Sequence, residues 1–145
     1  MRHLPARFTP NLLRRAIGLS LLVPVTAMAN NGLQPAAGPA GTPSIGEHNG
    51  VPVIDIVAPN ASGLSHNQFL DYNVGQPGVV LNNALDAGHS QLAGALGANP
   101  QFQGQAAATI VNEVISRNAS SIEGAQEIFG LSLIHISEPT RQEAI

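Results

Sequence analysis

The residues of this sequence that could take part in catalysis are a few serine, histidine and aspartate side chains. Ser65, His66 and Asp71 supply the residue types of a hydrolytic triad, in which a base activates a hydroxyl nucleophile and a carboxylate orients that base. Residue types without a geometry are common, so these three residues alone do not predict a triad. The histidines of the central chain share no metal-ligand spacing; they are His48, His66 and His89.

A second catalytic hypothesis is a β-helix enzyme that cleaves acidic polysaccharides, with an acid cluster formed by Asp55, Asp71 and Asp86. Such a lyase usually recruits Arg or Lys to stabilise developing enolate charge. Between residues 30 and 130, Arg117 is the one Arg or Lys residue. The sequence therefore predicts no catalytic residue, no cofactor and no metal site.

Charge is distributed unevenly along the 145 residues. The chain has six Arg, no Lys, nine Asp plus Glu and no cysteine, for a formal net charge of −3. Seven of the carboxylates lie between residues 30 and 130, opposed there by Arg117 alone. These figures exclude a disulfide scaffold, a cysteine-ligated metal and a basic nucleic-acid binder. We predict no nucleic-acid partner and no stable membrane insertion.

The first 29 residues have the order of a secretory signal peptide. A basic segment, Met1–Arg15, precedes the ten-residue apolar run Ala16–Val25, and small residues follow at Ala27 and Ala29. This pattern predicts cleavage between Ala29 and Asn30, and export through the inner-membrane translocon with removal by signal peptidase. A membrane-spanning helix is disfavoured because ten residues rise only about 15 Å. Arg14-Arg15 fits a twin-arginine motif poorly.

The last fifteen residues differ in origin from the rest. Leu131–Arg141 reads LSLIHISEPTR, which resembles, residue for residue, the in-frame translation of a sequencing-library adapter. We interpret residues 131–145 as a non-native tail. The natural chain is then expected to continue beyond Gly130.

The central chain reads as short strands and turns. Residues 30–42 are rich in Gly, Pro and Ala and predict a flexible leader. Asn49-Gly50 predicts a turn. Strands are predicted at 51–57, 67–74 and 79–81, whereas 87–98 fits strand or loop and 105–116 fits helix or strand. Short strands with asparagine turns favour a β-solenoid over a sandwich, although no strict repeat period is visible.

Residues 49–83 read NGVPVIDIVAPNASGLSHNQFLDYNVGQPGVVLNN. This run resembles the start of the two-partner-secretion domain of filamentous-haemagglutinin-like exoproteins, a family of adhesins, haemolysins and contact-dependent inhibition toxins. The resemblance continues to Gly130 through Gln91-Leu92, Asn99-Pro100, residues 110–114 and Arg117-Asn118. At Asn99-Pro100-Gln101-Phe102 it meets the family's Asn-Pro-Asn-Leu motif, from which Gln101 and Phe102 depart.

The resemblance implies an all-β fold: a right-handed parallel β-helix with an N-terminal cap, of which residues 43–130 form the first part. It implies a secretion-recognition domain rather than an enzyme. The partner would be an outer-membrane β-barrel transporter, whose periplasmic modules bind the exoprotein on its way to the cell surface or medium. A polysaccharide-active β-helix enzyme and a purely structural adhesin stalk are the alternatives. A partial domain with an open coil edge would be poorly stable and prone to aggregate.

Several residues are expected to shape the coil and carry the family motif. Gly63, Gly75 and Gly78 would adopt backbone conformations that side chains disfavour. Asparagines would bond turn backbone or stack in ladders, and Phe69, Tyr72, Val74, Val79 and Leu81 would pack inside. The motif residues are Gly63, Ser65, Asn67, Phe69, Asn73, Val74, Gly78, Asn82, Asn83, Asn99, Pro100, Asn112 and Glu113.

Overall fold

The computed structural model describes residues 32–130, which form nine strands. In chain order they are β1 (Leu33–Ala36), β2 (Ser44–His48), β3 (Val51–Asp55), β4 (Leu64–Tyr72), β5 (Val79–Asn82), β6 (Gly88–Ser90), β7 (Gly94–Leu96), β8 (Thr109–Val114) and β9 (Gln126–Phe129). The predicted signal peptide with its cleavage site at Ala27, Ala29 and Asn30, and the predicted tail 131–145, lie outside the described residues.

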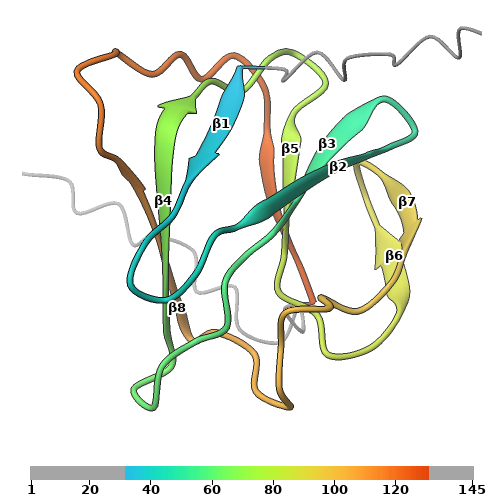
Figure 1. Cartoon of the computed structure of the whole chain (residues 1–145). Coiled ribbons are helices and arrows are strands. Elements are labelled where there is room, and N and C mark those ends of the chain that lie inside the picture. The colour runs from blue at the N-terminus through green and yellow to red at the C-terminus, as the bar shows by residue number, and fades with distance from the viewer. Residues whose placement is uncertain (1–31, 131–145) are drawn as a thin grey trace, which may run out of the picture.

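Parallel strands stack in two walls of a coil (Figure 1). In one wall β3 pairs with β5 and β5 pairs with β9; in the other, β4 pairs with β8. The chain thus returns to the same wall one level further along, which is the construction of a β-helix. The predicted parallel β-helix is confirmed, and the sandwich alternative is wrong.

The length of each turn of the coil explains why the sequence shows no repeat. Val53 pairs with Val80, 27 positions later, whereas Val80 pairs with Glu127, 47 positions later. The longer turn contains the antiparallel hairpin of β6 and β7, which lies at the side of the coil. An insertion in one turn and not the other removes any fixed period from the sequence.

An N-terminal cap of antiparallel strands begins the coil. β1 pairs with β4, and β2 pairs with β3 across the Asn49-Gly50 turn, where both residues have positive φ (52° and 78°). This is the two-residue hairpin turn that Asn-Gly favours. The prediction of a flexible leader over 30–42 is wrong for Leu33–Ala36, because Leu33 is only 1% exposed and anchors β1 in the core.

The segment 105–116, which fitted helix or strand, contains strand β8. Thr109, Ile110 and Val111 begin it, and β-branched residues of this kind favour strands when a neighbouring edge is available. That edge is β4, which β8 follows from Leu64↔Thr109 to Phe69↔Val114. Tertiary pairing therefore decides between two local patterns of similar strength.

The coil interior holds one apolar cluster, and a second cluster lies under the hairpin. The five predicted interior residues, Phe69, Tyr72, Val74, Val79 and Leu81, are all buried in the first. The second joins side chains of β3 and β5 to the hairpin and the last strand, and comprises Val51, Val53, Val80, Ala84, Ala93 and Phe129. The β6–β7 hairpin therefore covers the outer face of the β3–β5–β9 wall.

Two of the three predicted turn glycines have the expected conformation. Gly63 and Gly78 have φ of +79° and +85°, in the region that favours glycine. Gly75 does not have positive φ, so that expectation is wrong. A Cβ on Gly75 would meet only Pro77 Cδ, at 3.7 Å; the glycine that allows close approach here is Gly124, whose Cβ would lie 2.1 Å from the Gly75 carbonyl oxygen.

Candidate functional site

Buried side chains of β4 bind the backbone of the corner that joins β3 to β4. Ser65 Oγ donates to the carbonyl oxygen of Val57 (2.7 Å), and the Val57 N–H donates to Asn67 Oδ1 (2.9 Å). Asn67 Nδ2 in turn donates to Ser65 Oγ (3.2 Å). Two side chains thus replace the strand neighbour that Val57 lacks, which satisfies its buried backbone groups.

Asn83 repeats this arrangement one turn further on. Its Nδ2 donates to the carbonyl oxygen of Ala107 (3.0 Å), and the Ala107 N–H donates to Asn83 Oδ1 (2.7 Å). Asn83 is fully buried and directly follows β5, 24 positions before Ala107. The side-chain amide therefore closes the turn that contains the inserted hairpin.

Asn99 connects two levels of the coil. Its Nδ2 donates to the carbonyl oxygens of Ile56 (2.9 Å) and Asn82 (2.8 Å), and its Oδ1 accepts from the Gln101 N–H (2.9 Å). Gln101 Nε2 donates to the carbonyl oxygen of Asp55 (2.8 Å). Gln101 departs from the family motif yet bonds the same corner, and Phe102 packs against the main apolar cluster.

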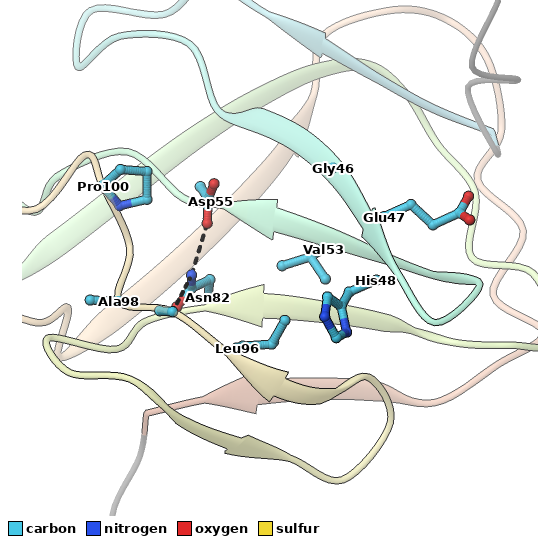
Figure 2. Close-up of a pocket in the computed structure, with 10 residues that line it drawn as sticks. Gly46, Glu47, His48, Val53, Asp55, Asn82, Leu96, Ala98 and Pro100 are labelled. Carbon is cyan, nitrogen blue, oxygen red and sulfur yellow. Dashed lines mark hydrogen bonds between the residues drawn. The ribbon is translucent and has the colours of Figure 1, made fainter. Parts of the chain in front are cut away.

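An open pocket of about 240 Å³ lies between the β2–β3 hairpin and the segment that follows β7. Asp55 and Asn82 face one another at one end of it, where Asn82 Nδ2 donates to Asp55 Oδ1 (2.8 Å), as Figure 2 shows. Pro100 borders this end and His48 the other. The exposed ring of Pro100 thus lies beside the pocket, while its neighbour Asn99 is buried beneath.

The remaining motif asparagines are Asn73, directly after β4, and Asn112, within β8. Asn73 Oδ1 accepts from the Ser121 N–H (2.8 Å) and fastens the turn after β8. Asn112 stands in register with Asn67 in the neighbouring strand, and Asn67 Nδ2 donates to the carbonyl oxygen of Val111 (3.4 Å). Asn112 Nδ2 donates to Tyr72 Oη (3.3 Å), while its Oδ1 is buried without a hydrogen-bond partner.

The catalytic hypotheses find no support in this geometry. Ser65 is buried and donates to a backbone carbonyl, and His66 Nε2 contacts Glu113 Oε2 (2.8 Å) rather than Ser65. Asp71 accepts from Asn118 Nδ2 (2.6 Å). Hydrogen bonds from Gln68 and His66 hold the pKa of Glu113 below its ordinary value. The contacts of His66 and Asp71 join β4 to β8 and to the segment after β8, and they do not form a triad.

The three aspartates of the lyase hypothesis are also occupied or dispersed. Asp55 accepts from Asn82 and Ser44, Asp71 accepts from Asn118, and Asp86 lies in an exposed bend before the hairpin. Within residues 32–130, no three His, Asp or Glu side chains are placed to hold a metal ion. The same residues form no helix long and apolar enough to span a membrane.

Glu127 is a structural residue that sequence reasoning missed. Its carboxylate, on β9, accepts from Ser90 Oγ (2.8 Å) and from the N–H groups of Gln91 and Leu92 (both 2.9 Å) in the hairpin turn. Partial burial raises the pKa of Glu127, but these hydrogen bonds outweigh it and hold the pKa below the ordinary value. No sequence motif marks a glutamate that bonds residues 35 to 37 positions away.

Residues of the N-terminal cap also bind the β6–β7 hairpin. His48 Nδ1 donates to the carbonyl oxygen of Ala93 (2.7 Å), and Asn49 Nδ2 donates to the same oxygen (2.8 Å). Glu127 binds the turn from β9, so the hairpin turn is fixed to both ends of the sheet β2-β3-β5-β9. Its position therefore depends on segments of the chain that lie far apart.

The last level of the coil leaves strand edges and apolar side chains uncovered within the described residues. β8 and β9 are the outer strands of their sheets. Four residues of this level are among the exposed large hydrophobics: Val111 (40%), Ile115 (48%), Ile122 (50%) and Ile128 (38%). This end, which we call the open end, contrasts with the capped end at β1 and β2.

The described residues therefore form a capped β-helix domain whose corners are bound by asparagine side chains. Residues 36–136 match the family described as the TPS secretion domain, where TPS stands for two-partner secretion, and the chain belongs to this family. A crystal structure of the filamentous hemagglutinin secretion domain is similar, with a TM-score of 0.61 and 40% identity, covering 68% of this chain and 32% of that one.

Curated relatives are much longer proteins. The hemolysin of Proteus mirabilis is 48% identical over 123 residues, which cover 85% of this chain and 8% of the relative. The hemolysin of Serratia marcescens is 49% identical over 122 residues (83% and 8%), and the tRNA nuclease CdiA of Escherichia coli O6:K15:H31 is 41% identical over 137 residues (90% and 4%). The chain therefore spans less than a tenth of the relatives that it matches.

Proposed function

We propose that this chain is the secretion-recognition segment of a long two-partner-secretion exoprotein and acts through a cognate outer-membrane β-barrel transporter. The observation that carries the proposal is the match of residues 36–136 to the TPS secretion domain. The relatives named hemolysin and tRNA nuclease CdiA support it, because proteins with different named activities share this segment.

The proposed role is non-enzymatic, and the exoprotein is delivered to the outside of the cell. The side chains with catalytic potential make structural hydrogen bonds, as Ser65 does with Val57. The route runs through the translocon, signal peptidase and the periplasm, where modules of the transporter bind the chain. The exoprotein then reaches the surface or the medium. The absence of cysteine supports this route, since no disulfide obstructs a second passage.

Recognition precedes folding in this proposal. The corners that shape the coil depend on distant partners: Asn83 needs Ala107, and the hairpin turn at Ser90 needs Glu127. These contacts form only after the chain has emerged as far as β9. The transporter modules therefore meet an extended chain whose strand edges are available for β-strand addition.

Co-expression with the transporter tests the proposal. The full chain, with its own signal, is produced in cells with and without the transporter, and the medium and periplasm are assayed. We expect the chain outside the cells only when the transporter is present, and retention of the chain on immobilised periplasmic modules. Equal release without the transporter would overturn the proposed function.

Two glycine variants separate recognition from folding. Gly124→Val places a Cβ 2.1 Å from the Gly75 carbonyl oxygen and blocks closure of the last turn. Gly46→Val is the matched control, because no atom lies within 4 Å of its Cβ. We expect the transporter modules to bind both variants, although only Gly46→Val folds. Loss of binding by Gly124→Val alone would show that the modules read the folded coil and would refute recognition before folding.

A further inference from the structure

Asn49 and Gly50, which form the turn of the β2–β3 hairpin, are a chemically labile pair. Both residues are exposed. In an Asn-Gly pair the backbone nitrogen of the glycine can attack the side-chain amide carbon of the asparagine, because glycine has no Cβ to obstruct the approach. Within residues 32–130 no other asparagine is followed by glycine. This chemistry is therefore concentrated at one turn of the described chain.

The amide of Asn49 also makes a specific contact with the β6–β7 hairpin. Its Nδ2 donates to the carbonyl oxygen of Ala93 (2.8 Å), 44 positions further along the chain, and His48 Nδ1 donates to the same oxygen (2.7 Å). Gly94 makes room for this contact, since its φ is +80° and a Cβ there would lie 3.0 Å from Asn49 Nδ2. The nitrogen that the labile chemistry would remove is thus one of two donors that hold the hairpin to the cap.

We propose that Asn49 is a site of spontaneous deamidation, which the folded turn slows and which weakens the attachment of the hairpin to the cap. The Gly50 nitrogen forms a bond to Asn49 Cγ, and the Cγ–Nδ2 bond breaks. Ammonia leaves with the proton of the Gly50 N–H, and a five-membered cyclic imide remains. Water then opens the imide at one of its two carbonyl groups, which gives aspartate or isoaspartate. Water is the only co-reactant.

The folded turn slows the first step in two ways. Asn49 must turn its amide onto the following peptide group, whereas the hydrogen bond to Ala93 holds that amide against the hairpin. The turn must also open, because the pairing of His48 with Val51 fixes Asn49 and Gly50 at φ of 52° and 78°. One lost hydrogen bond alone corresponds to a factor of up to about tenfold, so we expect the unfolded chain to react about tenfold faster or more.

Either product loses the bond to Ala93. A carboxylate has no N–H to donate, and its oxygens are repelled by the carbonyl oxygen that the amide bound. Isoaspartate also carries the former side-chain methylene in the main chain, which lengthens the two-residue turn that keeps His48 opposite Val51. The hairpin is then held from the cap by His48 alone of the two donors.

Mass spectrometry of the aged full chain tests the modification. The chain is kept in mildly alkaline buffer with and without urea, and the mass gain from amide to carboxylate is followed with time. Cleavage after Glu47 separates Asn49 from the other Asn-Gly pair of the sequence, Asn31-Gly32. We expect Asn49 to be modified in both samples and about tenfold faster or more in urea. Equal rates would overturn the protection by the fold, and an unmodified Asn49 in both samples would overturn the site.

Asn49→Asp tests the consequence for the hairpin, because it has the side chain of one product. Asp-Gly favours the same turn type as Asn-Gly, so the variant should fold and lack only the donor. We expect hydrogen exchange at the buried Ala93 amide, which donates to Ser90 Oγ, to be about threefold to tenfold faster than in the parent chain.

Asn60→Asp is the matched control. It makes the same chemical change in an exposed turn, where Asn60 Oδ1 accepts from the N–H groups of Ser62 and Leu64 and a carboxylate oxygen can replace it. We expect exchange at the Ala93 amide to match the parent chain in this variant. Parent-like exchange in Asn49→Asp, or equal acceleration in both variants, would overturn the proposed weakening of the hairpin.

Discussion

The middle and last levels of the coil pair their backbones in the same way but bury their side chains very differently. Every residue of β5 is buried, whereas β8 has no buried residue and β9 has only Phe129. Leu81 and Ile128 are register partners in adjacent strands, yet Leu81 is 5% exposed and Ile128 is 38% exposed. Parallel pairing on one side is therefore not enough to bury the side chains of a strand in this coil. A strand needs a neighbour on each side.

The polar positions show the same contrast. Asn67 is fully buried, its Oδ1 accepts from the Val57 N–H in the corner after β3, and its Nδ2 donates to Ser65 Oγ. Its register partner Asn112 leaves its buried Oδ1 without a hydrogen-bond partner. An unpaired buried acceptor costs roughly 1–3 kcal/mol. The last level therefore contributes less to stability than the level beneath it, although the same residue types line both.

The largest expected effect is a difference in the free energy of unfolding between variants of two register partners, Leu81 and Ile128. Leu81→Ala should lower the free energy of unfolding by about 2–5 kcal/mol, the range for a buried leucine. Ile128→Ala removes a similar side chain that already contacts water, so its loss should be about 1 kcal/mol. Urea unfolding of both variants, with slopes compared to the parent, measures the two values. Equal losses would mean that the last level is covered in solution.

The second comparison is between two asparagines that bind turn backbone, the buried Asn83 and the more exposed Asn73. Asn83→Ala leaves the buried N–H and C=O of Ala107 unpaired, and we expect a loss of about 2 kcal/mol. Asn73→Ala removes one bond to the exposed Ser121 N–H, where water can substitute, and should cost about 0.5 kcal/mol. Urea midpoints measure both. Similar losses would refute the view that Asn83 is required to close the long turn.

Much of the central fold follows from local sequence. The β-branched run at Val51–Asp55 and the alternation through Phe69 and Tyr72 predict strands, and Asn49-Gly50 predicts the turn that joins β2 to β3. Strand β2 itself is not predicted. The sequence also predicts that asparagines bind turn backbone, and Asn73 and Asn83 do so. Local pattern identifies these features because each one depends on only a few neighbouring residues.

What the sequence could not show depends on distant segments. β1 looks like a flexible leader until β4 supplies its partner edge. The period of the coil is concealed because one turn carries the inserted hairpin. Glu127 has no motif, since its donors belong to residues 90–92. Gln101 departs from the family motif but bonds the Asp55 carbonyl, a role that only the folded corner reveals.

Glu127 is the exception on the weak last level, and its titration gives the smallest expected effect. Its pKa is lowered in the folded state from the ordinary value of 4.5. The carboxylate therefore contributes stability that is fully present above that value and is lost as pH falls through the lowered pKa. Because the side chain is largely solvated, we expect only a small shift in the urea midpoint, reduced further by salt.

The experiment compares Glu127→Gln with Glu113→Gln from neutral pH down through the lowered pKa of each carboxylate. Both carboxylates have lowered pKa values, but Glu113 joins only exposed side chains, whereas Glu127 also binds the backbone of the hairpin turn. Acid should therefore speed hydrogen exchange at the Gln91 and Leu92 amides in the parent chain and in Glu113→Gln. In Glu127→Gln that exchange should already be fast at neutral pH. Slow exchange in this variant would show that the apolar contacts under the hairpin hold the turn without the carboxylate.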